Sequence, residues 1–144
     1  MRLVLDTNEY VYGLGPERLP PCERLIDTLG DFGAHDVRVL RVIVQEVCRN
    51  LPEHYHRSFF KTLDALMEAD CDIDEEFVVP HHVAQRYQDM GFKEGDAHIG
   101  AYAEVVEADV LVSENRRHFH AMAGHLPFKV MDAAQFMKRH AAAR

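Results

Sequence analysis

The sequence predicts an α/β fold: a three-layer α/β/α sandwich with a central, mostly parallel, five-stranded sheet. Five short apolar runs typical of buried strands alternate with segments whose apolar residues repeat at helical spacing. Strands that alternate with helices favour a parallel sheet covered on both faces. No internal repeat, low-complexity block or linker divides the 144 residues, so we expect a single domain over residues 1–144.

The expected strands are runs of mainly apolar residues bounded by polar or turn-forming residues. The run Val110-Leu111-Val112 is the clearest buried strand, and Pro80 stops the third of the five. The strands are expected at Arg2–Asp6, Val37–Arg41, Phe77–Val79, Asp109–Ser113 and Phe128–Met131.

The expected helices are recognised by apolar residues at positions i, i+3, i+4 and i+7. One begins at Pro20-Pro21, and we expect Gly30 and Gly33 to end it. The others are expected near Val44–Leu51, Glu53–Asp70, His81–Met90, Asp96–Glu107 and Ala133–His140, with a frayed tail at Ala141–Arg144.

The composition restricts the function classes. The chain has 16 Lys and Arg residues against 24 Asp and Glu residues, a formal net charge of −8. This argues against a protein that coats nucleic acid, because such binding needs Lys and Arg contacts to phosphates. It does not exclude a nuclease whose acids cluster around a divalent cation, because the bound cation reverses the local field.

Cysteine content and hydropathy indicate a cytoplasmic protein. Cys22, Cys48 and Cys71 form an odd set without CxxC spacing, so we interpret them as reduced core thiols. No apolar run approaches the roughly 20 residues needed to cross a bilayer. The apolar run before Asp6 is too short for a signal peptide. We therefore expect a cytoplasmic location and no membrane partner.

Polar side chains follow the first and fourth expected strands. Asp6 ends the first strand and is followed by Thr7-Asn8, which suit a turn or a helix start. Ser113 ends the fourth strand and is followed by Glu114-Asn115. Asp96 opens the preceding helix, where the helix dipole favours a carboxylate. Ligands of open α/β sheets bind beyond the carboxyl ends of the strands, so we expect these residues to converge there.

Glu46 is expected to join them, because it lies on the edge of a buried helical stripe and can point toward the end of the sheet. Carboxylates such as those of Asp6, Glu46 and Asp96 are the ligands that Mg²⁺ or Mn²⁺ prefers. Such a metal lowers the pKa of a bound water and stabilises the leaving oxygen of a phosphodiester displacement.

Four segments of the chain, taken in order, match a known pattern. They are Leu3–Asn8, Val44–Leu51, Gly95–Ala103 and Ala108–Phe119. This series resembles the PIN-domain family, which includes the toxin nucleases of bacterial toxin–antitoxin pairs. The first three segments are similar to those that carry the family's three acids, and the fourth is similar to its last strand and turn. The resemblance covers essentially the whole chain.

The resemblance implies a compact sandwich with a central parallel sheet and a metal-dependent endoribonuclease. The family's acids fall on Asp6, Glu46 and Asp96, which are expected to hold Mg²⁺ or Mn²⁺, and the fourth catalytic position falls on Asn115. The implied partners are an RNA substrate, an antitoxin protein and a second copy in a homodimer.

Four further residues are expected to contact the substrate. Ser113 occupies the position of the family's usual Thr or Ser, and Asn8 follows the first acid. Arg116 and Arg117 lie next to the expected site, where they either contact substrate phosphates or remain solvated.

Two positions depart from the family pattern. His118 stands where many members have Asp, so we expect one firmly held metal rather than two. Glu9 stands where many members have an apolar residue. Glu114 either supplies the missing charge or faces away.

Other interpretations remain open. Asp6 and Asp96 also suit helix caps, and Glu46 suits a solvated helix face. The histidine-rich sequence raises a zinc hypothesis, but His54-x-His56 and His81-His82 lack cysteine partners at zinc spacing, which favours surface histidines.

The alternative functions are a non-catalytic PIN-like domain that binds RNA or protein, favoured by His118, and phosphoryl chemistry with Asp6 as nucleophile. The second would need another acid close to Asp6 or a well-placed Lys, and Asp6–Glu9 offers neither convincingly. The sequence does not separate a toxin from a chromosomal RNA-processing enzyme.

Overall fold

The structure is a computed structural model that describes residues 1–29 and 35–140. Its centre is a five-stranded sheet in the order β3-β2-β1-β4-β5, in which every neighbouring pair is parallel. The strands are β1 (Arg2–Leu5), β2 (Asp36–Leu40), β3 (Ile73–Asp74), β4 (Val110–Val112) and β5 (Lys129–Met131). The expected α/β class is confirmed, and the sheet is entirely rather than mostly parallel.

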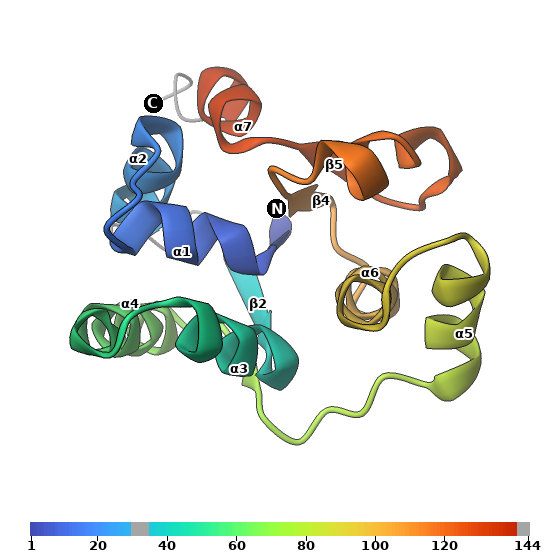
Figure 1. Ribbon diagram of the computed structural model, residues 1–144, viewed down its shortest axis with the longest axis horizontal. Helices are drawn as coiled ribbons and strands as arrows, with labels where there is room; N and C mark the ends of the chain where they lie inside the picture. Colours follow the sequence, from blue (N-terminus) through green and yellow to red (C-terminus); the bar gives the residue numbers. More distant parts are fainter. Residues whose placement is uncertain (30–34, 141–144) are drawn as a thin grey trace.

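Seven α-helices flank this sheet in the described part of the chain (Figure 1). They are α1 (Thr7–Leu14), α2 (Pro20–Leu29), α3 (Arg41–Asn50), α4 (His56–Glu68), α5 (His81–Asp89), α6 (Glu94–Val105) and α7 (Ala133–His140). Helix α1 packs against both α2 and α3, α7 packs against α2, and α5 packs against α6. None of the helices in the described ranges is long and apolar enough to span a membrane.

The carboxyl ends of β1, β4 and β5 lie level with one another. Leu5 is in register with Val112, which is in register with Met131. The backbone N–H of Asp6 donates to the carbonyl of Val112 (2.9 Å), and that of Ser113 donates to the carbonyl of Met131 (2.9 Å). Asp6, Ser113 and Asp132 therefore leave the sheet at the same edge.

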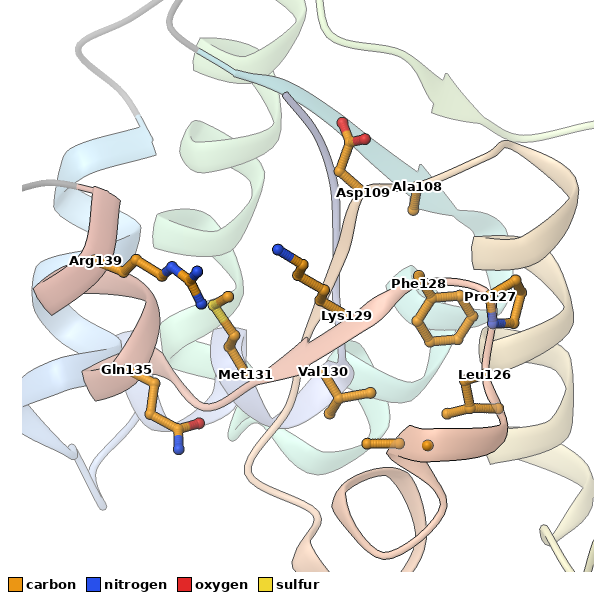
Figure 2. A pocket seen from close by; sticks show the side chains of 12 residues that line it. Ala108, Asp109, Leu126, Pro127, Phe128, Lys129, Val130, Met131, Gln135 and Arg139 are labelled. Atoms are coloured by element: carbon orange, nitrogen blue, oxygen red, sulfur yellow. The ribbon is translucent and has the colours of Figure 1, made fainter.

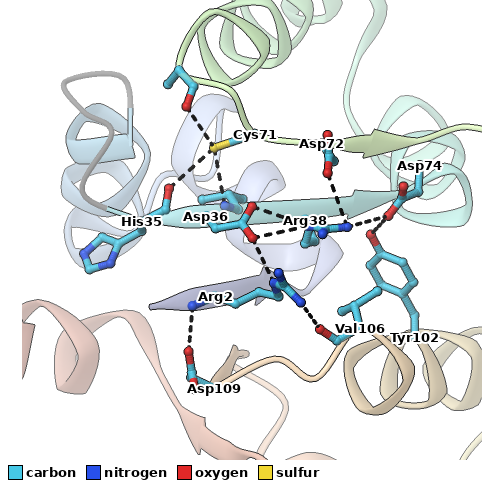
Figure 3. A network of polar contacts seen from close by, with 12 residues as sticks. Arg2, His35, Asp36, Arg38, Cys71, Asp72, Asp74, Tyr102, Val106 and Asp109 are labelled. Atoms are coloured by element: carbon cyan, nitrogen blue, oxygen red, sulfur yellow. Dashed lines mark hydrogen bonds and ion pairs between the residues drawn. The ribbon is translucent and has the colours of Figure 1, made fainter.

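The opposite edge of the sheet is held by a network of ion pairs and hydrogen bonds (Figure 3). The Arg2 guanidinium binds Asp36 through Nε (2.8 Å) and donates to the carbonyl of Val106 (2.6 Å). The backbone N–H of Arg2 donates to Asp109 Oδ2 (2.7 Å). Since these contacts join the amino ends of β1, β2 and β4, we assign this edge a structural role.

The expected third strand at Phe77–Val79 is wrong. That segment is irregular and its central residue, Val78, is 82% exposed, whereas the strand beside β2 is the shorter β3. An apolar run is typical of a buried strand, but here the chain already pairs with β2 through β3, shortly after α4 ends. Asp74 fixes β3 there, because it accepts a hydrogen bond from Tyr102 and lies 3.6 Å from the Arg38 guanidinium (Figure 3).

The other expected elements are present with small shifts of their ends. Helix α6 begins two residues before Asp96, and the long expected helix is a 3-10 turn (Glu53–Tyr55) followed by α4. All three cysteines are free, with Cys22 and Cys71 buried and Cys48 half-buried. Gly30, Gly33 and the Ala141–Arg144 tail lie outside the described residues.

Candidate active site

Asp6 lies at the centre of the candidate site. It follows β1 and caps α1, where its Oδ1 accepts a hydrogen bond from the backbone N–H of Thr7 (2.8 Å). Its Oδ2 accepts a hydrogen bond from the hydroxyl of Ser113 (2.8 Å), at the end of β4. With only 4% of its surface exposed, the carboxylate is held rigidly between β1 and β4.

Glu46 reaches the same edge from α3. Its Oε2 accepts a hydrogen bond from the hydroxyl of Thr7 (2.9 Å). On the other side it faces Gly95 in the first turn of α6, where an added Cβ would lie 2.7 Å from Glu46 Oε1. The absence of a side chain at position 95 therefore allows α6 to approach the Glu46 carboxylate closely.

Asp96 approaches from the first turn of α6 and is connected to the loop after β4. Asn115 donates from Nδ2 to Asp96 Oδ2 (3.2 Å), and His118 Nδ1 lies 3.4 Å from the same oxygen. Asn115 is itself fixed, because its N–H donates to Ser113 Oγ (3.0 Å) and its Oδ1 accepts from the N–H of His118 (3.1 Å). Asp6 and Asp96 are thus connected through Ser113 and Asn115.

The electrostatics of this cluster favour a bound cation. The pKa of Asp6 is raised from 3.8 to about 7: burial is the largest cause, the nearby Asp96 and Glu46 act in the same direction, and the hydrogen bonds from Ser113 and Thr7 oppose the rise. In the described part of the chain, no Lys or Arg forms an ion pair with any of the three acids. Three carboxylates without a Lys or Arg partner repel one another, and a divalent cation would remove that cost.

The donor atoms suit a hard cation that keeps some of its water. The carboxylate oxygens, with the Asn115 amide nearby, match the preference of Mg²⁺ or Mn²⁺. The ligand atoms of Asp6, Glu46 and Asp96 do not all lie within 4.8 Å of one another. This spacing fits direct binding by one or two carboxylates with water completing the shell, the usual arrangement for Mg²⁺.

The residues expected to contact substrate are placed less uniformly. Ser113 is fully buried, and its hydroxyl donates a hydrogen bond to Asp6 and accepts one from the N–H of Asn115. Asn8 is half-buried in the first turn of α1, and within the described residues its side chain makes no hydrogen bond to the network. Arg116 is paired with Asp132 Oδ2 (2.5 Å) although 67% of its side chain is exposed. Arg117 is exposed in the same turn.

Two residues with a part in the geometry were not singled out by the sequence. Thr7 links Asp6 to Glu46, and Gly95 admits Glu46 beside α6. Thr7 had a recognisable signal, since a hydroxyl directly after a strand-end acid falls in the first turn of the next helix. Gly95 has no comparable signal, because a close approach between α3 and α6 cannot be recognised from the local sequence.

Two hollows in the surface differ in their position relative to the candidate site. One of about 330 Å³ adjoins Glu46 and Gly95 and is also lined by Arg49 and His98. A hollow of about 820 Å³ lies elsewhere, beside β5, where Asp109 and Lys129 belong to the amino ends of β4 and β5 (Figure 2). The larger hollow therefore contains none of the three acids.

Comparison with known proteins identifies the fold. No protein-family model and no curated protein matches the chain. Among solved structures, FitAcB from Neisseria gonorrhoeae aligns over 92% of this chain and 98% of its own, with a TM-score of 0.64 and 16% identity. The chain has a PIN-like fold.

Two further structures agree with this assignment of a PIN-like fold. VapBC2 from Rickettsia felis, bound to a DNA fragment from their promoter, aligns over 92% of this chain and 98% of its own, with a TM-score of 0.61 and 15% identity. FitAB bound to an IR36 DNA fragment aligns over 91% and 94%, with a TM-score of 0.60 and 17% identity. The expected resemblance is thus confirmed as a likeness of fold.

Proposed function

We propose that the protein is a metal-dependent endoribonuclease that hydrolyses RNA phosphodiester bonds. One observation carries the proposal: Asp6, Glu46 and Asp96, from three elements far apart in the sequence, meet at the carboxyl edge of a PIN-like sheet without a basic partner among the described Lys and Arg residues. Such a cluster is costly unless a cation occupies it, which supports a metal site over a set of helix caps.

The roles of the residues follow from their contacts. Asp6, Glu46 and Asp96 would hold Mg²⁺ or Mn²⁺, which when bound supplies an activated water and stabilises the leaving oxygen. Asn115 orients Asp96 through its amide. Ser113 holds Asp6 in place and keeps its pKa below the value that burial alone would give.

The substrate contacts are assigned to the rim of the site. Arg117 is exposed beside the turn that carries Asn115, so its guanidinium can reach a phosphate. Arg116 can do the same through the nitrogens that do not bind Asp132. Asn8 lies in the first turn of α1, next to Asp6 and Thr7.

The proposed setting is a cytoplasmic toxin–antitoxin pair, with an antitoxin protein as partner and a homodimer as the assembly. The likeness to FitAcB and to VapBC2, the latter bound to a promoter fragment, supports this setting. A PIN-like domain that only binds RNA or protein is the second candidate. The observation that favours it is His118, which leaves the far side of the site with an imidazole beside Asp96 in place of a further acid.

The test is an RNA-cleavage assay of wild type, Asp6→Asn and Asp96→Asn, with and without Mg²⁺ or Mn²⁺. Asp27→Asn, on an exposed position of α2, is the matched control. Both site variants are expected to lose more activity than the roughly 10- to 100-fold cost of changing a group that only orients a metal ligand. Equal cleavage by all four proteins, or cleavage that survives excess EDTA, would overturn the proposal, and no cleavage by wild type would favour the binding domain.

A further inference from the structure

A second group of potential metal ligands lies on the other side of α1. It consists of Glu9 on α1, Cys22 on α2 and Glu114 in the loop after β4. Cys22 Sγ lies 3.0 Å from Glu9 Oε2 and 3.3 Å from Glu114 Oε1. Across residues 1–29 and 35–140, this is the one trio of His, Cys, Asp or Glu whose ligand atoms all lie within 4.8 Å of one another.

Glu9 supplies independent evidence that something is bound here. Its side chain is completely buried, and its Oε1 has no hydrogen-bond partner. The charged groups that act on it are Glu114, Asp6 and Asp132, all of them acids. A buried carboxylate with an unsatisfied oxygen and acidic neighbours is destabilising, and a cation between Glu9 and Glu114 would satisfy both.

The trio is separate from the candidate active site. Thr7 and Glu9 are two positions apart on α1, so their side chains point about 200° apart around the helix. Thr7 faces Glu46 on α3, whereas Glu9 faces Cys22 on α2. Helix α1 packs against both of these helices and so separates the two groups.

We propose that Glu9, Cys22 and Glu114 bind a transition-metal ion of the Zn²⁺ class. With Zn–S near 2.3 Å and Zn–O near 2.0 Å, tetrahedral ligands place sulfur and oxygen about 3.5 Å apart. The two sulfur–oxygen distances here, 3.0 and 3.3 Å, are within about half an ångström of that value. A thiolate ligand favours Zn²⁺ and related ions over Mg²⁺, which prefers oxygen.

Binding requires the thiol to release its proton to solvent, so that Cys22 coordinates as a thiolate. The three protein ligands leave the fourth tetrahedral position to water. The ion would connect α1, α2 and the end of β4, and Glu114 already accepts a hydrogen bond from the N–H of Ala133 at the start of α7 (3.4 Å). We therefore assign it a stabilising role rather than a catalytic one.

The test is a Co²⁺ titration of the metal-free full chain followed by absorption spectroscopy. Thiolate coordination gives a charge-transfer band in the near ultraviolet that carboxylates do not give. The band is expected in wild type, in Cys48→Ser and in Asp96→Asn, and excess Zn²⁺ should remove it. It should be absent in Cys22→Ser, and Co²⁺ affinity should fall more than about tenfold in Glu9→Gln and Glu114→Gln.

Each other result overturns the proposal. No band in wild type, or a band that persists in Cys22→Ser, excludes Cys22 as a ligand, and unchanged affinity in both glutamine variants excludes the carboxylates. Glu114→Gln alters a half-buried side chain, so it keeps the test decisive if Cys22→Ser does not fold. Asp96→Asn is expected to retain the band, so the two proposals are tested separately. If the band test excludes this metal site, the proposed nuclease activity still stands. If the cleavage assay excludes the nuclease activity, the proposed metal site still stands.

Discussion

The hydroxyl of Ser113 donates a 2.8 Å hydrogen bond to Oδ2 of Asp6, although the two residues are 107 positions apart in the chain. The bond exists because β1 and β4 are parallel neighbours whose last residues are in register. The same hydroxyl accepts the N–H of Asn115, which binds Asp96. One serine therefore fixes the positions of two acids in the candidate site.

Ser113→Ala should weaken both metal binding and the fold, and it should also change the pH dependence of the reaction. The hydrogen bond favours the charged carboxylate, so its loss raises the pKa of Asp6 and moves the acid limb of the pH–rate profile to higher pH. Metal affinity near neutral pH should fall about tenfold, while the free energy of unfolding falls by roughly 1–3 kcal/mol. Isothermal titration and thermal melts measure both quantities. Ser58→Ala on the exposed face of α4 is the control, and an unshifted pH profile would contradict the assigned role.

Gly95→Ala should separate activity from stability. The added Cβ would meet Glu46 Oε1 at 2.7 Å, and since that atom ends a flexible side chain, the carboxylate moves and the helix does not. Metal-dependent cleavage should fall about tenfold or more. The melting temperature should be unchanged or higher, because Ala favours a helix over Gly by up to about 1 kcal/mol.

Gly124→Ala is the matched control for this change, because an added Cβ there meets no atom within 4 Å. Unchanged cleavage by Gly95→Ala would mean that the position of Glu46 does not matter for catalysis.

The order of elements was predictable because strong local patterns matched the final burial. Val110–Val112 is a fully buried inner strand, and the stripe of Cys22, Leu25, Ile26 and Leu29 is the buried face of α2. The strand predicted at Phe77–Val79 is absent, because nothing in the local sequence distinguishes an exposed apolar run from a buried one. The true β3 is two residues long, too short for any periodicity, and is defined by pairing with β2.

Only the part of the candidate site that follows from the order of the strands could be predicted from the sequence. Parallel strands bring Asp6 and Ser113 to one edge of the sheet. Asp96 lies in α6, the helix that precedes β4, and β4 ends just before Ser113. The links through Thr7 and Asn115 depend on side-chain directions that the sequence does not contain. The approach of Glu9 to Cys22 likewise follows from the packing of α1 on α2, for which 13 residues of separation gives no signal.

The metal-free protein should lose stability as the pH rises. Burial and the neighbouring Glu114 raise the pKa of Glu9 from 4.5 to about 8. The folded state therefore favours protonated Glu9. Its contribution is complete below about pH 4.5 and is lost as the pH rises through about 8, and Asp6 acts in the same direction up to about pH 7.

Glu9→Gln cannot ionise and should melt at least about 3 °C higher than wild type near pH 9 in EDTA, with little difference near pH 5. Differential scanning fluorimetry across this range measures the effect. Glu17→Gln, at an exposed position, is the control. Parallel curves for wild type and Glu9→Gln would contradict the assigned ionisation.

Arg117→Ala should weaken RNA binding without changing the chemical step. An exposed guanidinium beside the site contributes a phosphate contact, so KM should rise severalfold while kcat is unchanged. The slope of log affinity against log salt should fall by about one. Arg57→Ala on an exposed position of α4 is the control. Equal KM values for Arg117→Ala and Arg57→Ala would show that Arg117 does not contact the substrate.

The central claim is that Asp6, Glu46 and Asp96 hold one divalent metal. Mn²⁺ titration followed by electron paramagnetic resonance tests it directly, because free and bound Mn²⁺ differ in signal. Wild type and Asp27→Asn are expected to bind with the same affinity and Asp96→Asn at least about tenfold more weakly. Equal binding by all three proteins would contradict the claim.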